Sequence, residues 1–116
     1  IAIDPQYPKA LYNRGVALAD LGDHESAVAS YDECLAINPG VGVVHTNRGV
    51  ALAALHRFQE AIDAFDTALS LNPDDVSALN NKGICLSRMG RDGEAMEAMD
   101  RARKLSRLPH IQRGVL

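Results

Sequence analysis

The histidines and cysteines of this chain are the side chains best suited to bind a metal or to act as nucleophiles and bases. They are His24, His45, His56, His110, Cys34 and Cys85. None of the histidines lies four residues from another histidine or from a cysteine, and no CxxC motif occurs. The spacing that brings zinc ligands together is therefore missing. We expect no metal site, no disulfide framework, and two reduced thiols that pack like small apolar residues.

Paired carboxylates could act as general acid and base, and two such pairs are Asp74 with Asp75 and Asp63 with Asp66. The first pair lies in a predicted linker and the second on a predicted solvated helix face, where capping and solubility are the ordinary roles. The chain has no glycine-rich phosphate loop and no nucleophile elbow. The sequence thus predicts no catalytic residue, no cofactor, no small-molecule substrate and no enzyme activity.

Asparagine is a further residue type with a regular arrangement, because Asn-(Arg/Lys)-Gly triplets begin at Asn13, Asn47 and Asn81. The interval from the first triplet to the second is the same as that from the second to the third. A side-chain amide carries donors and an acceptor, so evenly spaced amides could bind the main chain of a peptide without selecting its side chains. Such chemistry requires equivalent structural elements that repeat at the same interval.

Many other positions keep this interval, as expected of a repeat. The equivalent sets are Gly15, Gly49 and Gly83; Leu18, Leu52 and Leu86; Ala27, Ala61 and Ala95; and Tyr31, Phe65 and Met99. Leu11, Gly15 and Leu18 recur at i, i+4 and i+7, which is the spacing of one helix face. A second helix follows in each unit, and Asn38-Pro39 and Asn72-Pro73 end it in the first two units.

This period, with its glycine, alanine, aromatic and proline positions, resembles the tetratricopeptide-repeat family over nearly the whole chain. The resemblance implies an all-α fold, a right-handed superhelix of antiparallel helix pairs. It places three repeats at residues 8–41, 42–75 and 76–109. In each repeat, the recurrent glycine and alanine let the two helices approach closely, and the recurrent large residue is expected to fill the gap to the neighbouring pair.

A turn is predicted between the two helices of each repeat, at Gly22-Asp23, His56-Arg57 and Gly90-Arg91. Glycine after a helix adopts the left-handed conformation without a steric penalty. The middle repeat has His56 in this place, which lacks that freedom.

Both ends of the chain depart from the regular repeat. Residues 1–7 are expected to be the remnant of a preceding repeat, because Ile1–Pro5 matches Leu35–Pro39 at the same interval. An arbitrary extended segment is the alternative. Residues 110–116 are expected to form a C-terminal tail or cap, either a short extra helix or a linker, since Ser106-Arg107 replaces the Asn-Pro stop.

In this family the first helices line the concave side of the superhelix, and the resemblance therefore implies a peptide-binding groove on one face of these helices. Its expected residues are Lys9, Tyr12, Asn13, Val16, Val43, Thr46, Asn47, Val50, Ser77, Asn80, Asn81, Ile84 and Arg88, with Asp20 and Ala54 at the ends of the first two rows. The asparagine row is similar to the asparagine ladders of some family members, which implies an extended peptide along the groove. The alternative is that these amides are solvated or bond to nearby main chain.

Val16, Val50 and Ile84 run beside the asparagines and predict a neutral, partly apolar floor. We expect a weakly bound partner segment, extended or helical, that is uncharged to mildly polar. Some family members clamp the C-terminal carboxylate of chaperones with Lys and Asn on the first repeat, Asn on the next, and Lys and Arg on the third. The matching residues here are Tyr12, Val16, Asn47, Ser77 and Asn81, and Asn47 is the single match. We therefore expect no binding of chaperone tails, since a carboxylate needs charge-assisted donors.

The mild net charge of −3 and the lack of a basic patch argue against a nucleic-acid partner. No apolar run approaches the roughly 20 residues of a membrane span, so no membrane partner is expected. Reduced cysteines and the lack of a signal peptide favour the cytoplasm. The sequence thus predicts a protein-protein interaction module whose partner is a protein or peptide. Two alternatives stay open: a homo-oligomer that self-associates through uncovered end faces, and the targeting arm of a larger enzyme.

Overall fold

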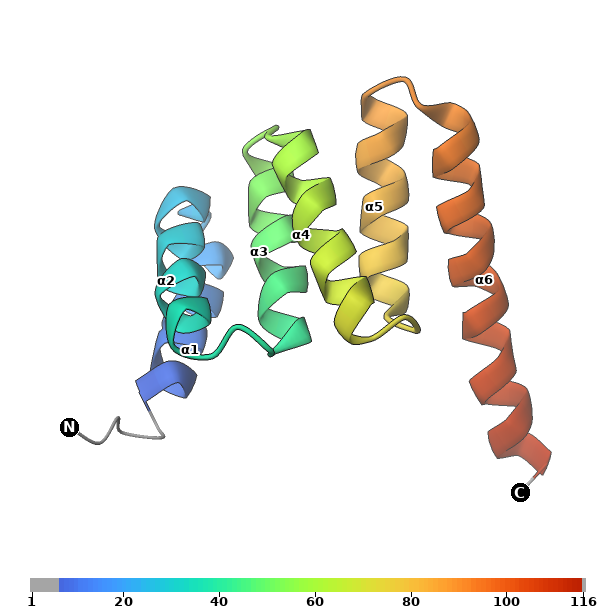
Figure 1. The fold of residues 1–116 in the computed structure, drawn as a ribbon, viewed down its shortest axis with the longest axis horizontal. Helices are drawn as coiled ribbons and strands as arrows, with labels where there is room; N and C mark the ends of the chain where they lie inside the picture. Colours follow the sequence, from blue (N-terminus) through green and yellow to red (C-terminus); the bar gives the residue numbers. More distant parts are fainter. Residues whose placement is uncertain (1–6, 116) are drawn as a thin grey trace.

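The computed structural model describes residues 7–115, with side chains described through residue 107, and this part of the chain consists of six helices and no strand. The helices are α1 (Tyr7–Asp20), α2 (His24–Ile37), α3 (Gly42–Ala54), α4 (Phe58–Leu71), α5 (Val76–Arg88) and α6 (Asp92–Val115). Consecutive helices run antiparallel in three hairpins that follow one another along the molecule (Figure 1). The predicted α–α superhelix is confirmed.

The curvature of the superhelix places the first helices on its inner side. Each hairpin packs on the next through its second helix, as α2 on α3 and α4 on α5. The first helices also approach one another, α1 to α3 and α3 to α5, whereas the described parts of α2, α4 and α6 make no such approach. The concave side is therefore lined by α1, α3 and α5, which carry the predicted groove residues.

In each hairpin a large side chain of the second helix packs directly on a glycine of the first helix. A Cβ atom placed on Gly49 of α3 would lie 2.5 Å from the ring of Phe65 of α4. A Cβ atom on Gly83 would lie 2.7 Å from Cγ of Met99, and Gly15 stands against Tyr31 in the same way. These large residues therefore contact the glycine of their own hairpin first. Tyr31 also lines a pocket with residues of α3, so its contact with Gly15 accompanies the expected packing toward the neighbouring pair.

The turn between the two helices of each hairpin has the same backbone geometry in all three repeats. Gly22 and Gly90 have φ angles of 85° and 78°, and His56 adopts 61°. In the middle turn the main-chain N–H of Arg57 donates to the carbonyl of Leu52 at 2.9 Å, as its equivalents do in the other turns. The middle turn is thus regular although a histidine occupies the left-handed position, where the ring of His56 stacks on Phe58 with centroids 5.5 Å apart.

The C-terminal helix is much longer than its equivalents, with 24 residues against 14 in α2 and in α4. The helices α2 and α4 are followed by the C-cap residues Asn38 and Asn72, which adopt extended conformations before a proline. Ser106-Arg107 lacks that stop, so α6 continues without interruption across the predicted boundary between residues 109 and 110. Residues 110–115 are therefore part of α6 itself and form neither a separate short helix nor a linker. The predicted remnant at residues 1–7 lies outside the described residues, except for Tyr7.

Replacing Gly49 by leucine should destabilise the protein by about 3 kcal/mol, because the new side chain would overpack the ring of Phe65 against α3. Urea unfolding followed by circular dichroism measures the effect. Gly93→Ala is the matched control, since nothing lies within 4 Å of a Cβ there. Its gain should be about 0.5–1 kcal/mol. Equal stabilities of the two variants would contradict the close contact at Gly49.

Replacing His56 by glycine should stabilise the protein by about 1 kcal/mol, because glycine adopts a positive φ without the penalty that a side chain carries. The loss of the contact with Phe58 reduces this gain. The reciprocal Gly90→His change should destabilise by a similar amount. Thermal unfolding checks both, and a stabilised Gly90→His protein would rule out the conformational argument.

Candidate peptide-binding groove

The apolar residues predicted for the groove form an exposed rib across the three first helices. Val50 of α3 and Ile84 of α5 are 41% and 51% exposed, and Val16 of α1 is half-buried. Val43, at the start of α3, is 51% exposed. Because α1, α3 and α5 line the concave side, these side chains are accessible there.

The three predicted asparagines have different hydrogen-bonding partners. Asn13 is exposed, whereas Asn47 donates from Nδ2 to the hydroxyl of Tyr12 at 2.9 Å. Asn81 donates from Nδ2 to the main-chain carbonyl of Ser77 at 2.9 Å. Among the described residues no donor contacts the Oδ1 atom of any of the three, so each keeps an acceptor for a partner. The alternative of local main-chain bonding therefore describes Asn81, and Asn47 instead joins α3 to α1.

Thr46 does not belong to the accessible groove, although the sequence placed it there. Its side chain is 4% exposed and donates to Oδ2 of Asp75 at 2.7 Å, with a second contact to the carbonyl of Gly42 at 3.2 Å. Asp75 in turn caps α5 by accepting from the main-chain N–H of Ala78 at 3.0 Å. Thr46 thus connects two hairpins at their inner edge, and its hydroxyl is not available to a peptide.

The remaining predicted residues lie at the two ends of the groove. Lys9, Ser77 and Asn80 are exposed. Arg88, at the end of α5, is exposed and holds its guanidinium 5.1 Å from the centre of the Phe58 ring. This cation–π contact orients the cation toward α4.

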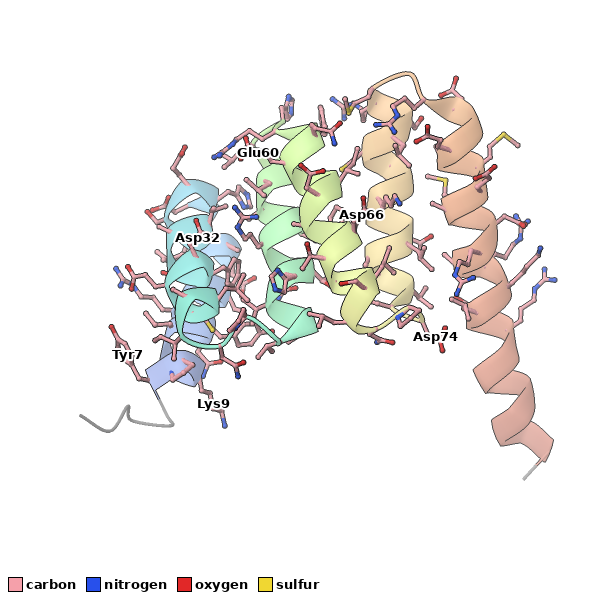
Figure 2. The ribbon with its side chains drawn as sticks, viewed as in Figure 1. Tyr7, Lys9, Asp32, Glu60, Asp66 and Asp74 are labelled. Carbon is pink, nitrogen blue, oxygen red and sulfur yellow. The ribbon has the colours of Figure 1, made fainter. Side chains whose placement is uncertain are left out.

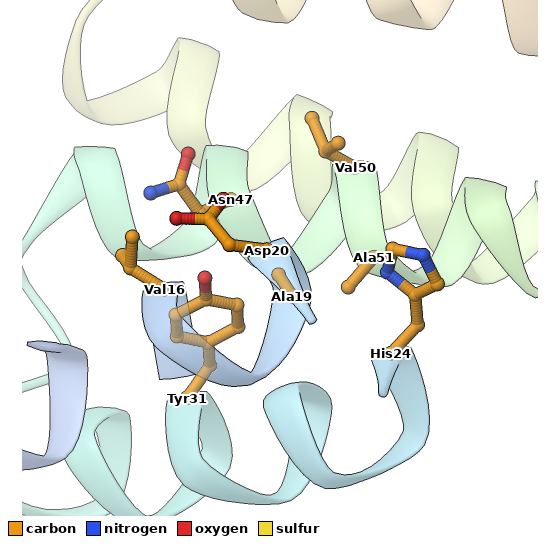
Figure 3. Close-up of a pocket in the computed structure, with 8 residues that line it drawn as sticks. All are labelled: Val16, Ala19, Asp20, His24, Tyr31, Asn47, Val50 and Ala51. Atoms are coloured by element: carbon orange, nitrogen blue, oxygen red, sulfur yellow. The ribbon is translucent and has the colours of Figure 1, made fainter. Parts of the chain in front are cut away.

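A small pocket opens between the first two hairpins, with a volume of about 190 Å³. Its lining comes from α1, α2 and α3, and comprises Val16, Ala19, Asp20, His24, Tyr31, Asn47, Val50 and Ala51 (Figure 3). The hydroxyl of Tyr31 points toward Val16 and Asp20 (Figure 3). Burial, with smaller contributions from Tyr12 and Asp20, raises the pKa of Tyr31 above its ordinary value, so this hydroxyl stays neutral and can donate a hydrogen bond.

The pocket also holds an unsatisfied polar atom. Nδ1 of His24, at the first position of α2, is buried and has no hydrogen-bond partner among the described residues. Sequence reasoning missed the contribution of His24 and Tyr31 to the lining of this pocket because both lie on a second helix. The signal that could have found them is their place opposite the gap between consecutive first helices.

The residues that could support other chemistry have structural roles here. Both cysteines are buried and reduced, and burial raises the pKa of Cys34 and of Cys85, which makes them poor nucleophiles. Asp66 pairs with Lys82 across two hairpins at 2.7 Å. In the described part of the chain no three histidine, cysteine or acidic residues gather as metal ligands, and no helix there is both long and apolar enough to span a bilayer.

Comparison with known proteins finds similar family models and similar solved structures. Family models described as tetratricopeptide repeat match residues 8–41 and 46–108. The first TPR of Spaghetti (RPAP3), bound to the HSP90 peptide SRMEEVD, is 23% identical, covers 99% of this chain and 98% of that chain, and has a TM-score of 0.85. No curated protein sequence matches.

Two further solved structures are more similar in sequence. A mutant of MamA is 31% identical, with 90% of this chain and 76% of that chain covered and a TM-score of 0.82. The complex of the TPR2AB domain of yeast Sti1 with pHSP90 is 27% identical, with 89% of this chain and 40% of that chain covered and a TM-score of 0.84.

Replacing Thr46 by valine should destabilise the protein by about 1–2 kcal/mol, because the half-buried carboxylate of Asp75 loses a hydrogen bond. Thr67→Val is the matched control, since Thr67 is exposed and bonds only the carbonyl of Asp63 in its own helix. Chemical unfolding compares the two variants. A neutral Thr46→Val protein would mean that the bond to Asp75 contributes nothing to the junction of α3 and α5.

Proposed function

The chain belongs to the tetratricopeptide-repeat family of non-catalytic interaction scaffolds, and on this premise we propose that it binds an extended peptide segment along its concave groove. The observation that carries the proposal is the exposed rib of Val16, Val50 and Ile84 beside the amides of the asparagine row.

The rib provides the apolar part of the binding energy. Val50 and Ile84 are large apolar side chains left about half exposed on a surface that the fold does not cover. Completing the burial of such a side chain is worth on the order of 1 kcal/mol. Two or three contacts of this size support weak binding, since each step of about 1.4 kcal/mol changes affinity about tenfold.

The amides provide directional contacts to a main chain. The Oδ1 atoms of Asn13, Asn47 and Asn81 can accept from peptide N–H groups, and the exposed Asn13 can also donate. Bonds to the main chain do not depend on the peptide's side chains. Selectivity then comes from the peptide side chain that the pocket between Val16 and Val50 admits.

The preferred peptide differs from the HSP90 tail that some structural neighbours bind. That tail is acidic, as its sequence SRMEEVD states. In this chain the charged groups along the groove are Lys9, Asp20 and Arg88, and Arg88 is engaged with Phe58. Ser77 and Asn81 stand where a carboxylate clamp has cations. We therefore expect an uncharged or mildly polar segment to bind better than an acidic tail.

We also propose that the chain carries no catalytic activity of its own. The carboxylates with the right spacing for acid-base work are used as a helix cap at Asp75 and in the ion pair of Asp66 with Lys82. The thiols are buried with raised pKa values. These roles leave recognition as the function that the surface supports best.

The test begins with selection of peptides from a random library on the wild-type protein. Affinities of a selected peptide are then measured by fluorescence anisotropy for Val50→Asp and for the triple variant Asn13→Ala, Asn47→Ala and Asn81→Ala. Each should weaken binding about tenfold or more, which corresponds to roughly 1.4 kcal/mol. Asp63→Ala, an exposed change on α4 away from the concave side, should leave affinity unchanged.

Unaltered affinity in both groove variants, with circular dichroism showing them folded, would place the binding surface elsewhere. The peptide SRMEEVD serves as a second probe. It should bind the wild-type protein less tightly than the selected peptides. The double change Ser77→Lys and Asn81→Arg should raise its affinity by supplying the missing charge-assisted donors. Tight binding of SRMEEVD to the wild-type protein would contradict the predicted preference.

A further inference from the structure

Each junction between consecutive hairpins contains an ion pair in the same register, and the first junction has a further pair of Arg57 with Glu25 at 3.8 Å. Arg48 of α3 contacts Asp32 of α2 at 2.5 Å, and Lys82 of α5 contacts Asp66 of α4 at 2.7 Å. In both pairs the acid precedes the base by the same interval, from the second helix of one hairpin to the first helix of the next. Asp32 lies on α2 and Asp66 on α4, which are the second helices of the first two hairpins (Figure 2).

Within the described residues, α1 and α6 carry the two halves of this arrangement that do not pair across a junction. Arg14 of α1 stands one repeat before Arg48, and Asp100 of α6 stands one repeat after Asp66. Among residues 7–107, Arg14 has no ionic partner and its side chain is exposed, while Asp100 contacts only cations of its own helix, Arg103 and Lys104. One end therefore presents the base of a junction and the other end presents the acid.

Apolar side chains at junction positions are also exposed on α6 and on α1, although their equivalents in the internal junctions are more buried. Val28 and Ile62 are 6% and 3% exposed beneath the next hairpin, but Met96 at the same position of α6 is 72% exposed. On the opposite face, Leu21 of α1 is 82% exposed, while its equivalents are more covered: Leu55 is half-buried and Met89 is 42% exposed. Ala17 of α1 is exposed, whereas its equivalents in the second and third hairpins, Ala51 and Cys85, are buried.

We propose that two copies of this chain dock head to tail, with the face of α6 that is turned away from the preceding hairpin against the face of α1 that is turned away from the following hairpin. The contact consists of an ion pair of Arg14 with Asp100 and an apolar contact of Met96 and Met99 with Leu21. The new junction repeats the geometry of the two internal ones. This surface is separate from the concave groove, so stacking does not depend on the proposed peptide-binding function.

The carboxylate of Asp100 can take part although it already has partners. A carboxylate accepts about four hydrogen bonds, and Lys104 contacts one oxygen of Asp100 while Arg103 contacts the other. The hydrogen bond from Lys104 and the nearby Arg103 lower the pKa of Asp100, which keeps it ionised at neutral pH. Arg103 stands where Leu35 and Leu69 pack in the internal junctions, so the end face is less apolar and its association is weaker.

Head-to-tail docking joins two different faces and does not close on itself, so it builds open chains of increasing length. Sedimentation equilibrium should therefore show a weight-average mass that rises steadily with protein concentration. The mass should fall again at high salt, because exposed ion pairs are screened. A protein that stays monomeric at every concentration would overturn the proposal.

Charge reversal identifies the faces. Asp100→Arg alone and Arg14→Asp alone should each lower the association constant about tenfold, because attraction is replaced by repulsion. An equimolar mixture of the two variants should associate again, since each altered face meets its complement. Failure of the mixture to recover would also overturn the proposal.

Two controls separate this surface from others. Asp63→Arg makes the same charge change on α4, away from both ends, and should leave association unchanged. Val50→Asp, in the groove, should also leave it unchanged, so that loss of peptide binding and loss of stacking can be told apart. Met96→Asp should weaken association with no loss of helicity or thermal stability, because Met96 is already mostly exposed. Association of Met96→Asp as strong as that of the wild-type protein would exclude the α6 face.

Discussion

The contact of a large side chain with a bare glycine backbone determines the spacing of the two helices in every hairpin. Tyr31, Phe65 and Met99 occupy the place where a Cβ of Gly15, Gly49 or Gly83 would stand. Because the helices are this close, one hairpin is a thin layer whose two broad faces remain apolar, and only stacking can bury them. The curvature, the inner surface made of first helices and the exposed ends all follow from that layer.

The inner surface combines structural and accessible polar groups at equivalent repeat positions. Tyr12, Thr46 and Asn80 occupy the same position in three repeats, yet Tyr12 accepts a bond from Asn47, Thr46 is buried against Asp75, and Asn80 faces solvent. Tyr12 and Thr46 each contact the hairpin that follows, whereas no hairpin follows that of Asn80 among the described residues. Equivalence in sequence therefore does not give equivalent contacts or exposure.

Most of the fold could be predicted from the sequence, because the constant repeat interval reports the packing that every repeat must share. The hairpins, the turn at His56 and the helix stops before Pro39 and Pro73 all follow from it. The site was less predictable, since periodicity places a residue on a helix face but cannot say which neighbour it contacts. Thr46 was misplaced because its partner, Asp75, lies on the loop before the next hairpin. His24 was overlooked because it lines the pocket from a second helix.

The packing order α1–α2–α3–α4–α5–α6, in which each helix contacts mainly its sequence neighbours, also shapes the dynamics of the molecule. Fraying of a terminal hairpin breaks one junction, whereas opening the central hairpin breaks two. Amide protons of α3 and α4 are therefore the last to exchange with solvent. Local unfolding of the described helices begins at the first and last hairpins and reaches the central hairpin last. The small pocket between α1 and α3 lies across the first of these junctions, so a ligand seated there would slow the fraying of the N-terminal hairpin.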